Sequence, residues 1–413
     1  MPGTFTWKDR DAWLELHDEL ERREVNSRPA DRYPVIHGRL YTGELVSMLD
    51  ALNAGPRPFP WAVSRVQKLT ALHVVVGSHV DEGTPLTQFS ARLPGLQHWL
   101  SRRWYTTEVA PVDDGRPHVT IVAKYPEVAI VNLADAKLQL SLDVLPEEKG
   151  QGGFVLSTMG RVTIIPTVPQ PFGTLLEIFG RVAALLTMMS GGPISTDQIL
   201  VALAGGGLDS SVLLSLRNSE TCTFTEEDQF FLVERTLGTS LSEALTRWFD
   251  VYSNIDLPSR LAVDVLNDEG NTHLDFLGVM QALEGFHRGL NRPAPGVRVT
   301  LRERLLSLAE VIPDDIRRKI IGHDFGVVGK WVKARNAYSH WDVTLMPDAI
   351  DGMELISAIR RLKMLLRVSY RKRSSRHVPC GRVYLALGGV SRQGSRASKS
   401  SAVLALGSST RSA

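Results

Sequence analysis

The sequence predicts an α+β protein in which a β-rich N-terminal domain precedes an all-α helical bundle. Short alternating segments separated by Gly, Pro and Asp turns fill the first half, whereas apolar residues recur with a helical period from Phe224 onward. The 413 residues, 43% of them apolar, are enough for two domains with sizeable cores. We place the β-rich domain at residues 1–195, a connecting segment at 196–222, the helical domain at 223–372 and a basic low-complexity tail, expected to be disordered, at 373–413.

The N-terminal domain is expected to begin with a charged amphipathic helix over residues 7–26. Alternation around Gly38 and Gly43 predicts a β-hairpin next. The histidines of this half are scattered singly, which favours structural positions over a metal site. A helix at 173–189 closes the domain, and further strands are expected at 72–76, 118–124, 128–131, 138–142 and 160–165.

Composition excludes several classes of protein. The two cysteines, Cys222 and Cys380, are too few for a disulfide framework or a zinc site. The charged N-terminus and the lack of 18 consecutive apolar residues indicate a cytoplasmic protein without a membrane partner. Residues 371–413 hold nine Lys or Arg and no acid, which leaves a net charge of −7 on the rest of the chain. Any affinity for RNA must therefore come from a local patch or from the tail.

A glycine-rich sequence at Gly205–Ser211 follows an apolar segment at the centre of the chain. Such a loop can bind phosphate through backbone N–H groups at a helix N-terminus, so a nucleotide-binding enzyme is one alternative. That fold needs further strand and helix repeats, whereas the sequence after Glu226 is nearly all helical. A turn between two strands that link the domains is the favoured interpretation.

The second half predicts an up-down bundle of five to seven helices. Thr225 and Thr300 are candidate N-caps, and Pro258 is expected to begin a new helical segment. Leu274 is predicted to face inward from a helix over 271–290. The remaining helices are expected at 225–252, 258–266, 301–311, 313–323, about 326–340 and 348–370.

The stretch KWVKARNAYSHW, residues 330–341, holds the strongest candidate site. On a helix, Arg335 continues an apolar stripe that includes Trp331, so its guanidinium should point toward packed protein. Asn336 and His340 are four residues apart and share a face. Arg335 and His340 lie about 140° apart around the axis, so a single helix would hold them poorly against one phosphate. A second copy of the helix across a two-fold axis could bring them together.

The sequence Arg335-Asn-Ala-Tyr-Ser-His340 resembles the RNxxxH motif of the HEPN superfamily. More broadly, the chain resembles the ApeA-type HEPN ribonucleases of bacterial abortive-infection defence. For the N-terminal domain this resemblance implies sensing or target engagement, so a phage-derived trigger is expected to act there. The N-terminal segments that carry it are IHGRL at 36–40, VVVGSHVDEGTPLTQFSARLPGLQHWL at 74–100 and PQPFGTLLEIFGRVAALLTMM at 169–189.

The resemblance implies a homodimeric, metal-independent endoribonuclease without a cofactor. Its substrate is RNA, with transfer RNA as one candidate. His340 would move protons while the RNA 2′-OH attacks the neighbouring phosphorus, and Arg335 would stabilise charge on the phosphate oxygens. Asn336 would hold the phosphate or position Arg335. The products would be a cyclic phosphate and a free 5′-OH.

Four accessory residues complete the predicted site. Glu284, His287 and Arg288 are similar to the family's acidic and His/Arg-bearing helix, and their spacing fits one polar face. A carboxylate near His340 could raise the pKa of that imidazole and orient its ring, although a surface pair of Glu284 with His287 or Arg288 is equally compatible. Tyr338 could stack on a base, but packing in the core is favoured.

A toxic ribonuclease held silent until infection is the leading functional hypothesis. The alternative is a non-catalytic RNA- or protein-binding module that keeps the HEPN surface for dimerisation. The presence of Arg335, Asn336 and His340 together favours the enzyme, because a non-catalytic module has no obvious need for all three.

Overall fold

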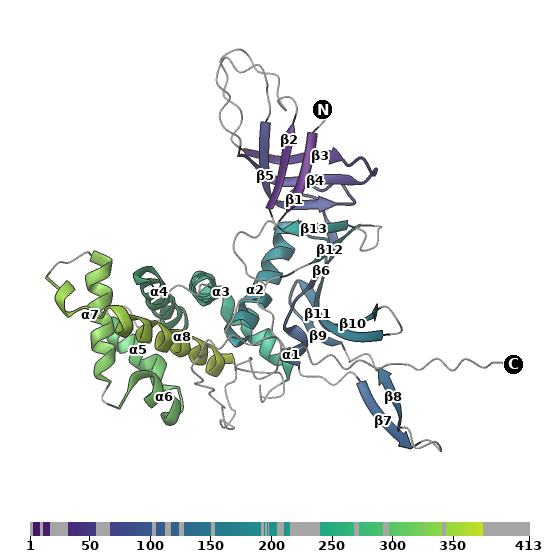
Figure 1. Ribbon diagram of the computed structural model, residues 1–413. Coiled ribbons are helices and arrows are strands. Elements are labelled where there is room, and N and C mark those ends of the chain that lie inside the picture. The colour runs from purple at the N-terminus through teal and green to yellow at the C-terminus, as the bar shows by residue number, and fades with distance from the viewer. Residues whose placement is uncertain are drawn as a thin grey trace, which may run out of the picture.

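A strand-rich N-terminal region precedes a helical region in the computed structural model, which confirms the predicted fold class (Figure 1). The structure describes residues 3–8, 11–16, 32–54, 67–100, 105–111, 117–123, 128–149, 153–190, 194, 196, 198–204, 210–214, 240–267, 272–291, 297–323, 325–340 and 344–374.

Eleven of the described strands form one sheet in the order β1-β2-β5-β13-β12-β6-β11-β10-β9, with β4 also paired to β5 and β3 to β4. Strands β7 and β8 pair with each other in a separate two-stranded sheet. The strand bounds are β1 Gly3–Lys8, β2 Asp11–Leu16, β3 Arg32–Arg39, β4 Leu45–Asn53, β5 Gln67–Val76, β6 Leu86–Arg92, β7 Tyr105–Pro111, β8 Pro117–Ala123, β9 Ala129–Asn132, β10 Ala136–Lys149, β11 Gly153–Pro166, β12 Ile199–Leu203 and β13 Ser210–Leu214.

The start of the chain corrects one prediction. Strands β1 and β2 form an antiparallel hairpin where an amphipathic helix was expected from residue 7, and β2 also pairs with β5. Ala12 and Leu16 lie on one side of β2 and are buried in a small core with Leu69 and Val74. Long-range pairing therefore overrides the local helical pattern, while residues 17–31 lie outside the described part of the chain.

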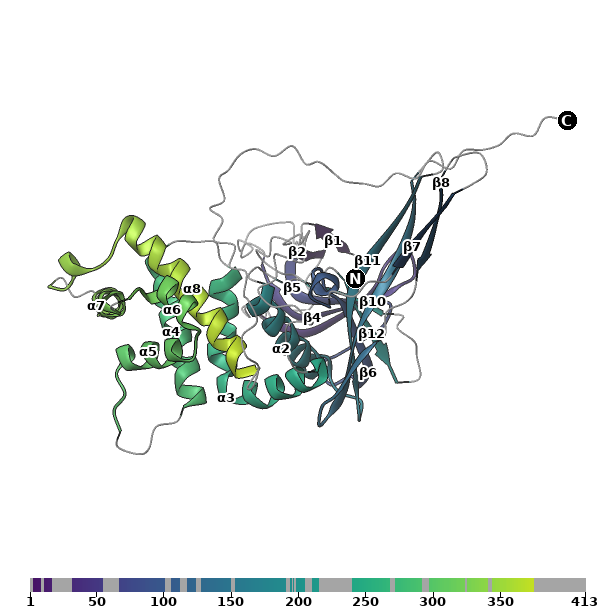
Figure 2. The same cartoon turned by 90° about the horizontal axis from the view of Figure 1, so that it is seen from below.

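The predicted hairpin around Gly38 and Gly43 is confirmed as β3 and β4, and Gly43 has a positive φ of 93° at the turn. The five predicted strands are also found, in β5, β8, β9, β10 and β11, although residue 128 precedes β9 and residue 124 lies outside the described residues. The predicted turn at 113–115 lies outside the described residues. The hairpin β10–β11 is longer than expected and lies on the side of α2 away from the helical bundle (Figure 2).

The centre of the sheet contains strands from the segment predicted to connect the domains. Strand β12 pairs with β13 and with β6, and β13 pairs with β5, all antiparallel. Ile199, Val201 and Val212 are buried in these strands. The described parts of residues 196–222 therefore belong to the sheet. Two strands flank the glycine-rich sequence as predicted, while the predicted turn at 205–209 lies outside the described residues. The remaining domain limits stay predictions, and residues 375–413 of the tail lie outside the described residues.

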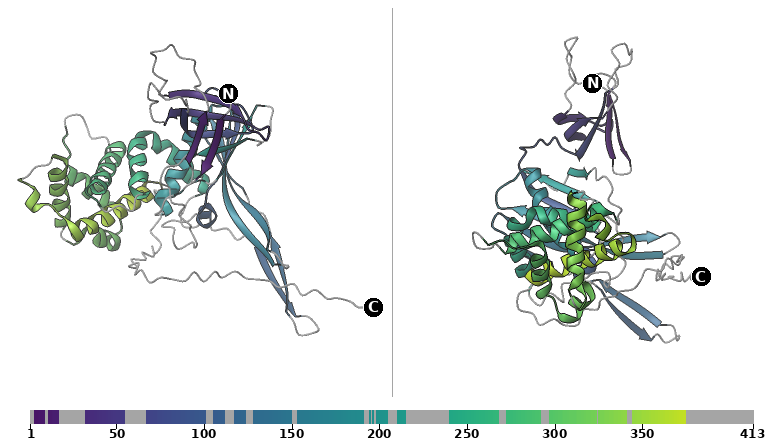
Figure 3. Two further views of the ribbon diagram at one scale, coloured as in Figure 1. Left: turned by 45° about the horizontal axis from the view of Figure 1, so that its top comes forward. Right: turned by 90° about the vertical axis from the view of Figure 1, so that its left-hand side faces the viewer.

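Helix α2, Phe172–Ser190, joins the two regions and confirms the helix predicted at 173–189. It packs against β11 on one side and against α3 (Leu241–Asn267) and α8 (Gly352–Ser374) on the other. The indole Nε1 of Trp248 on α3 donates to the carbonyl of Arg181, 2.8 Å away. A single hydrophobic cluster runs from the sheet through α2 into the bundle, and Figure 3 shows the bundle against one side of the strands.

Among the described helices, α2 alone has the length and apolar character of a membrane span, with a mean hydropathy of 1.5. More than half of that window is buried inside the protein, and core helices pass the same test.

The helical region extends to the end of the described chain. Helix α3 is kinked at Ile255, three residues before Pro258, so the segment predicted to start at Pro258 is the second arm of α3. Residues 224–239, which include the predicted cap Thr225, lie outside the described residues. The helix bounds are α1 Leu96–Leu100, α3 Leu241–Asn267, α4 His273–Leu290, α5 Leu301–Glu310, α6 Asp314–Ile321, α7 Gly326–His340, the 3-10 helix η3 Met346–Asp348 and α8 Gly352–Ser374.

Helix α4 is held closely against α3. A Cβ on Gly289 would lie 2.4 Å from the carbonyl oxygen of Asn254, and one on Gly285 would lie 2.8 Å from Cγ of Pro258. Leu274, predicted to face inward, is 77% exposed in the first turn of α4, whereas Leu283 is buried as expected. The close crossing sets the position of the α4 face that carries Glu284.

Candidate functional site

Helix α7 lies at the end of the bundle farthest from the strands (Figure 1). Val328, Trp331 and Ala334 are fully buried at helical spacing and pack the helix against α4, α5 and α6. Lys330 Nζ lies 3.0 Å from Glu354 Oε1 on α8, which adds an exposed ion pair. The residues of the predicted motif are therefore carried by a helix that is anchored along its length.

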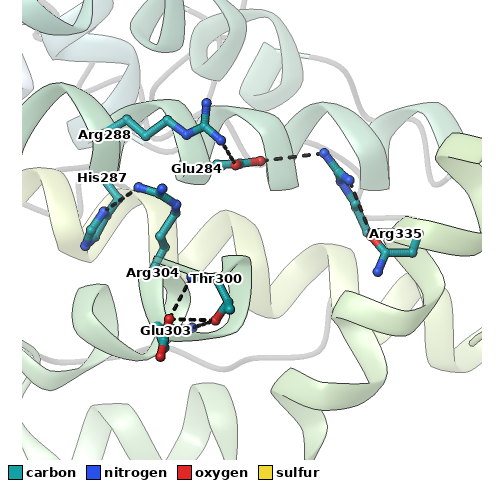
Figure 4. A network of polar contacts seen from close by, with 8 residues as sticks. Glu284, His287, Arg288, Thr300, Glu303, Arg304 and Arg335 are labelled. Carbon is teal, nitrogen blue, oxygen red and sulfur yellow. Dashed lines mark hydrogen bonds and ion pairs between the residues drawn. The ribbon is translucent and has the colours of Figure 1, made fainter. Parts of the chain in front are cut away.

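Arg335 points toward packed protein, as the periodicity predicts. Its side chain is only 25% exposed, and Nη2 lies 3.6 Å from Glu284 Oε2 on α4 (Figure 4). Its Nη1 donates to the side-chain oxygen of the neighbouring Asn336 at 3.3 Å. Two of the three predicted catalytic residues are thus in direct contact.

Glu284 lies between two guanidinium groups (Figure 4). Its Oε1 accepts from Arg288 Nη2 at 2.6 Å, one turn along α4, and its Oε2 faces Arg335. The carboxylate is 17% exposed, whereas Arg288 is 63% exposed. The expected pair of Glu284 with Arg288 is found. Among the described residues of one chain, the ion pairs of the Glu284 carboxylate are with Arg288 and Arg335. The predicted contact of a carboxylate with His340 is not seen there.

His287 does not share this polar face, which corrects the prediction. It is buried, and its Nδ1 accepts from Arg304 Nη1 on α5 at 3.4 Å (Figure 4). His287 is directed at Arg304 on α5 in the interior, whereas Glu284 is directed at Arg288 and Arg335. The buried Arg304 was missed from the sequence, although its spacing to the buried Leu308 could have identified it.

His340 is the last residue of α7 and is exposed, while Asn336 is half-buried. Arg335 turns toward α4, so the guanidinium and the imidazole do not converge within one chain among the described contacts. This separation agrees with the angle of about 140° expected from the helix geometry.

Tyr338 lies in the core, which the sequence favoured over base stacking. It is 8% exposed, and its hydroxyl donates to the carbonyl of Ile350. Its ring meets His273 edge-on at 4.4 Å and Phe276 at 6.1 Å between centroids. Burial raises the pKa of Tyr338 above its usual value, with a smaller contribution from Asp351.

The glycine-rich sequence does not lie in the setting of a nucleotide-binding loop. The flanking strands β12 and β13 form an antiparallel hairpin, whereas phosphate loops of α/β folds lead from a parallel strand into a helix. Residues 205–209 themselves lie outside the described residues. No group of three or more His, Cys, Asp or Glu that could hold a metal ion is found in the described part of the chain.

A strand-rich region followed by a helical bundle with Arg335, Asn336 and His340 on α7 defines a HEPN-type protein. Residues 277–373 match the family model described as Apea-like HEPN. Residues 1–248, more than half of the chain, match the model described as ApeA N-terminal domain 1, so the chain belongs to the ApeA family. No curated protein and no solved structure matches the chain. The family assignment indicates a defence-related HEPN module.

Proposed function

We propose that the chain is a HEPN endoribonuclease that cleaves RNA, with transfer RNA as one candidate, in bacterial abortive-infection defence against phage. The observation that carries the proposal is the placement of Arg335. Its guanidinium is largely withdrawn from solvent and bonded to Asn336, on a helix that ends at the exposed His340. A partly buried guanidinium with an amide beside it is suited to bind a phosphate in bidentate fashion.

The proposed reaction is transesterification by the neighbouring 2′-OH. His340 would accept the proton of the 2′-OH as a general base, or donate one to the leaving 5′ oxygen as a general acid. Arg335 would stabilise the negative charge that develops on the nonbridging oxygens, and Asn336 would hold Arg335 or the phosphate in place. The 2′ oxygen forms a bond to phosphorus as the bond to the 5′ oxygen breaks, which leaves a 2′,3′-cyclic phosphate and a 5′-OH.

The proposed enzyme acts as a homodimer through the HEPN domain. Arg335 contacts Glu284 on α4 and His340 is exposed at the end of α7, so the described contacts do not bring the two groups together within one chain. Two copies of α7 related by a two-fold axis would place Arg335 of one chain near His340 of the other. Helix α7 lies at the outer end of the bundle (Figure 1), and Lys333 and His340 are exposed on it.

The N-terminal region is proposed to receive the trigger that releases a toxic activity in the cytoplasm. It has its own small core in β1–β5, in addition to the cluster that it shares with the bundle. A phage-derived molecule that binds there could act on the bundle through α2, which contacts both.

Substitution of the motif tests the proposal. His340→Ala and Arg335→Ala should each abolish cleavage of total RNA by the purified protein, because each removes a side chain that acts on the reacting phosphodiester. Sequencing of fragments with 5′-OH ends measures the loss. Lys333→Ala, an exposed cation on the same helix, is the matched control and should retain activity. Full cleavage by either motif variant would show that the motif does not carry the activity, whereas no cleavage by wild type would support the non-catalytic binding module.

A further inference from the structure

We propose that Glu284 restrains the nuclease by competing with RNA phosphate for Arg335, and that Arg288 modulates this restraint. The inference rests on the proposed function and assigns a regulation to the same site. It concerns one carboxylate shared by two guanidinium groups of different exposure (Figure 4).

The two contacts of Glu284 are unequal. Oε1 is 2.6 Å from Arg288 Nη2, the length of a strong charge-assisted hydrogen bond, whereas Oε2 is 3.6 Å from Arg335 Nη2. The contact of Glu284 with Arg335 is therefore the weaker of the two. If Arg335 moved to bind a phosphate, Glu284 would keep its hydrogen bond with Arg288 one turn away.

A carboxylate and a phosphate diester compete for the same donors. Both present paired oxygens that accept the parallel N–H groups of a guanidinium. Glu284 also places a negative charge beside the position where the phosphate would bind. Because the carboxylate is only 17% exposed, solvent screens this repulsion less than at an open surface. RNA must therefore displace Glu284 from Arg335 before Arg335 can stabilise the transition state.

Arg288 determines how strongly Glu284 acts on Arg335. Its own charge draws the carboxylate away from Arg335, so its removal should strengthen the Glu284–Arg335 pair. Arg288→Gln should then weaken RNA binding through Glu284. If Arg288 contacted RNA directly, Arg288→Gln would also weaken binding, but that loss would persist when Glu284 is neutral.

A double-mutant cycle in full-length protein carrying His340→Ala separates these effects, with a fluorescent single-stranded RNA as the probe. Glu284→Gln should lower the Kd by roughly two- to fivefold, the range of a partly exposed charge interaction. Arg288→Gln should raise the Kd, and this effect should vanish when combined with Glu284→Gln. Glu354→Gln removes a carboxylate from the exposed pair with Lys330 and should leave the Kd unchanged.

Cleavage assays in the protein with His340 intact complete the test. Restraint by Glu284 predicts that Glu284→Gln lowers KM without lowering kcat, whereas a positioning role predicts a lower kcat. A raised Kd or a reduced kcat for Glu284→Gln would overturn the proposed restraint. The proposed function would still stand if wild type cleaves RNA and Arg335→Ala does not. If wild type fails to cleave and Arg335→Ala binds RNA as wild type does, the proposed function itself fails.

Discussion

Arg335 is the residue on which the proposed site depends, because its side chain is mostly covered and paired with Glu284. Its spacing from buried residues predicted this withdrawn guanidinium. The same reasoning misplaced His287, because the residue that it contacts, Arg304, lies on another helix. Helix periodicity gives the direction of a side chain, but the partner in that direction depends on tertiary packing.

Tyr338→Phe tests the assignment of this ring to the core. The variant leaves the buried carbonyl of Ile350 without the hydroxyl donor and should lower the free energy of unfolding by about 1–2 kcal/mol. RNA affinity should stay unchanged, because the hydroxyl that is removed is bonded to Ile350 in the core. Urea unfolding and RNA titration measure the two effects, with the fully exposed Tyr41→Phe as control. Weaker RNA binding at unchanged stability would indicate that the hydroxyl contacts RNA instead.

At the scale of elements, the helices were predicted better than the first strands. Thr300 caps α5 with a capping box, because its hydroxyl accepts from the backbone N–H of Glu303 and the Glu303 carboxylate accepts from the backbone N–H of Thr300. These signals are local, so the sequence contains them. The β1–β2 hairpin was mistaken for a helix because its pairing with β5 involves residues more than fifty positions away.

The α5 cap makes a pH-dependent contribution to stability. The backbone N–H of Thr300, with its hydroxyl, holds the pKa of Glu303 below its usual value. A lowered folded pKa stabilises the protein above the unfolded pKa of about 4.3, and the contribution is lost as pH falls through the folded value. Glu303→Gln should therefore be less stable than wild type at neutral pH and converge with it at low pH.

Thr300→Ala should lower the free energy of unfolding by about 1 kcal/mol at neutral pH. Thermal unfolding across a pH series measures both variants. Thr246→Ala is the matched control, since its hydroxyl bonds Ser242 within α3 and caps no helix. Equal losses for Thr246→Ala and Thr300→Ala would show that the capping box contributes nothing specific.

At the scale of the whole molecule, the class of fold followed from two periodicities, but the sheet order did not. Strands β12 and β13 lie between β5 and β6, although well over a hundred residues separate β6 from β12. Such long-range register depends on the complete fold and leaves no local pattern. The motif was likewise readable on one helix, and its helical spacing suggested a second chain, but the residues that would form the contact between two chains could not be predicted from that spacing.

The central claim is that Arg335 and His340 from two chains act on one RNA linkage. The most direct test co-expresses Arg335→Ala and His340→Ala subunits with different tags, isolates the mixed dimer and measures RNA cleavage against each homodimer. The account predicts inactive homodimers and a mixed dimer with up to about half of wild-type activity, because one of its two sites keeps both groups. A mixed dimer as inactive as its parents, beside an active wild-type dimer, would contradict it.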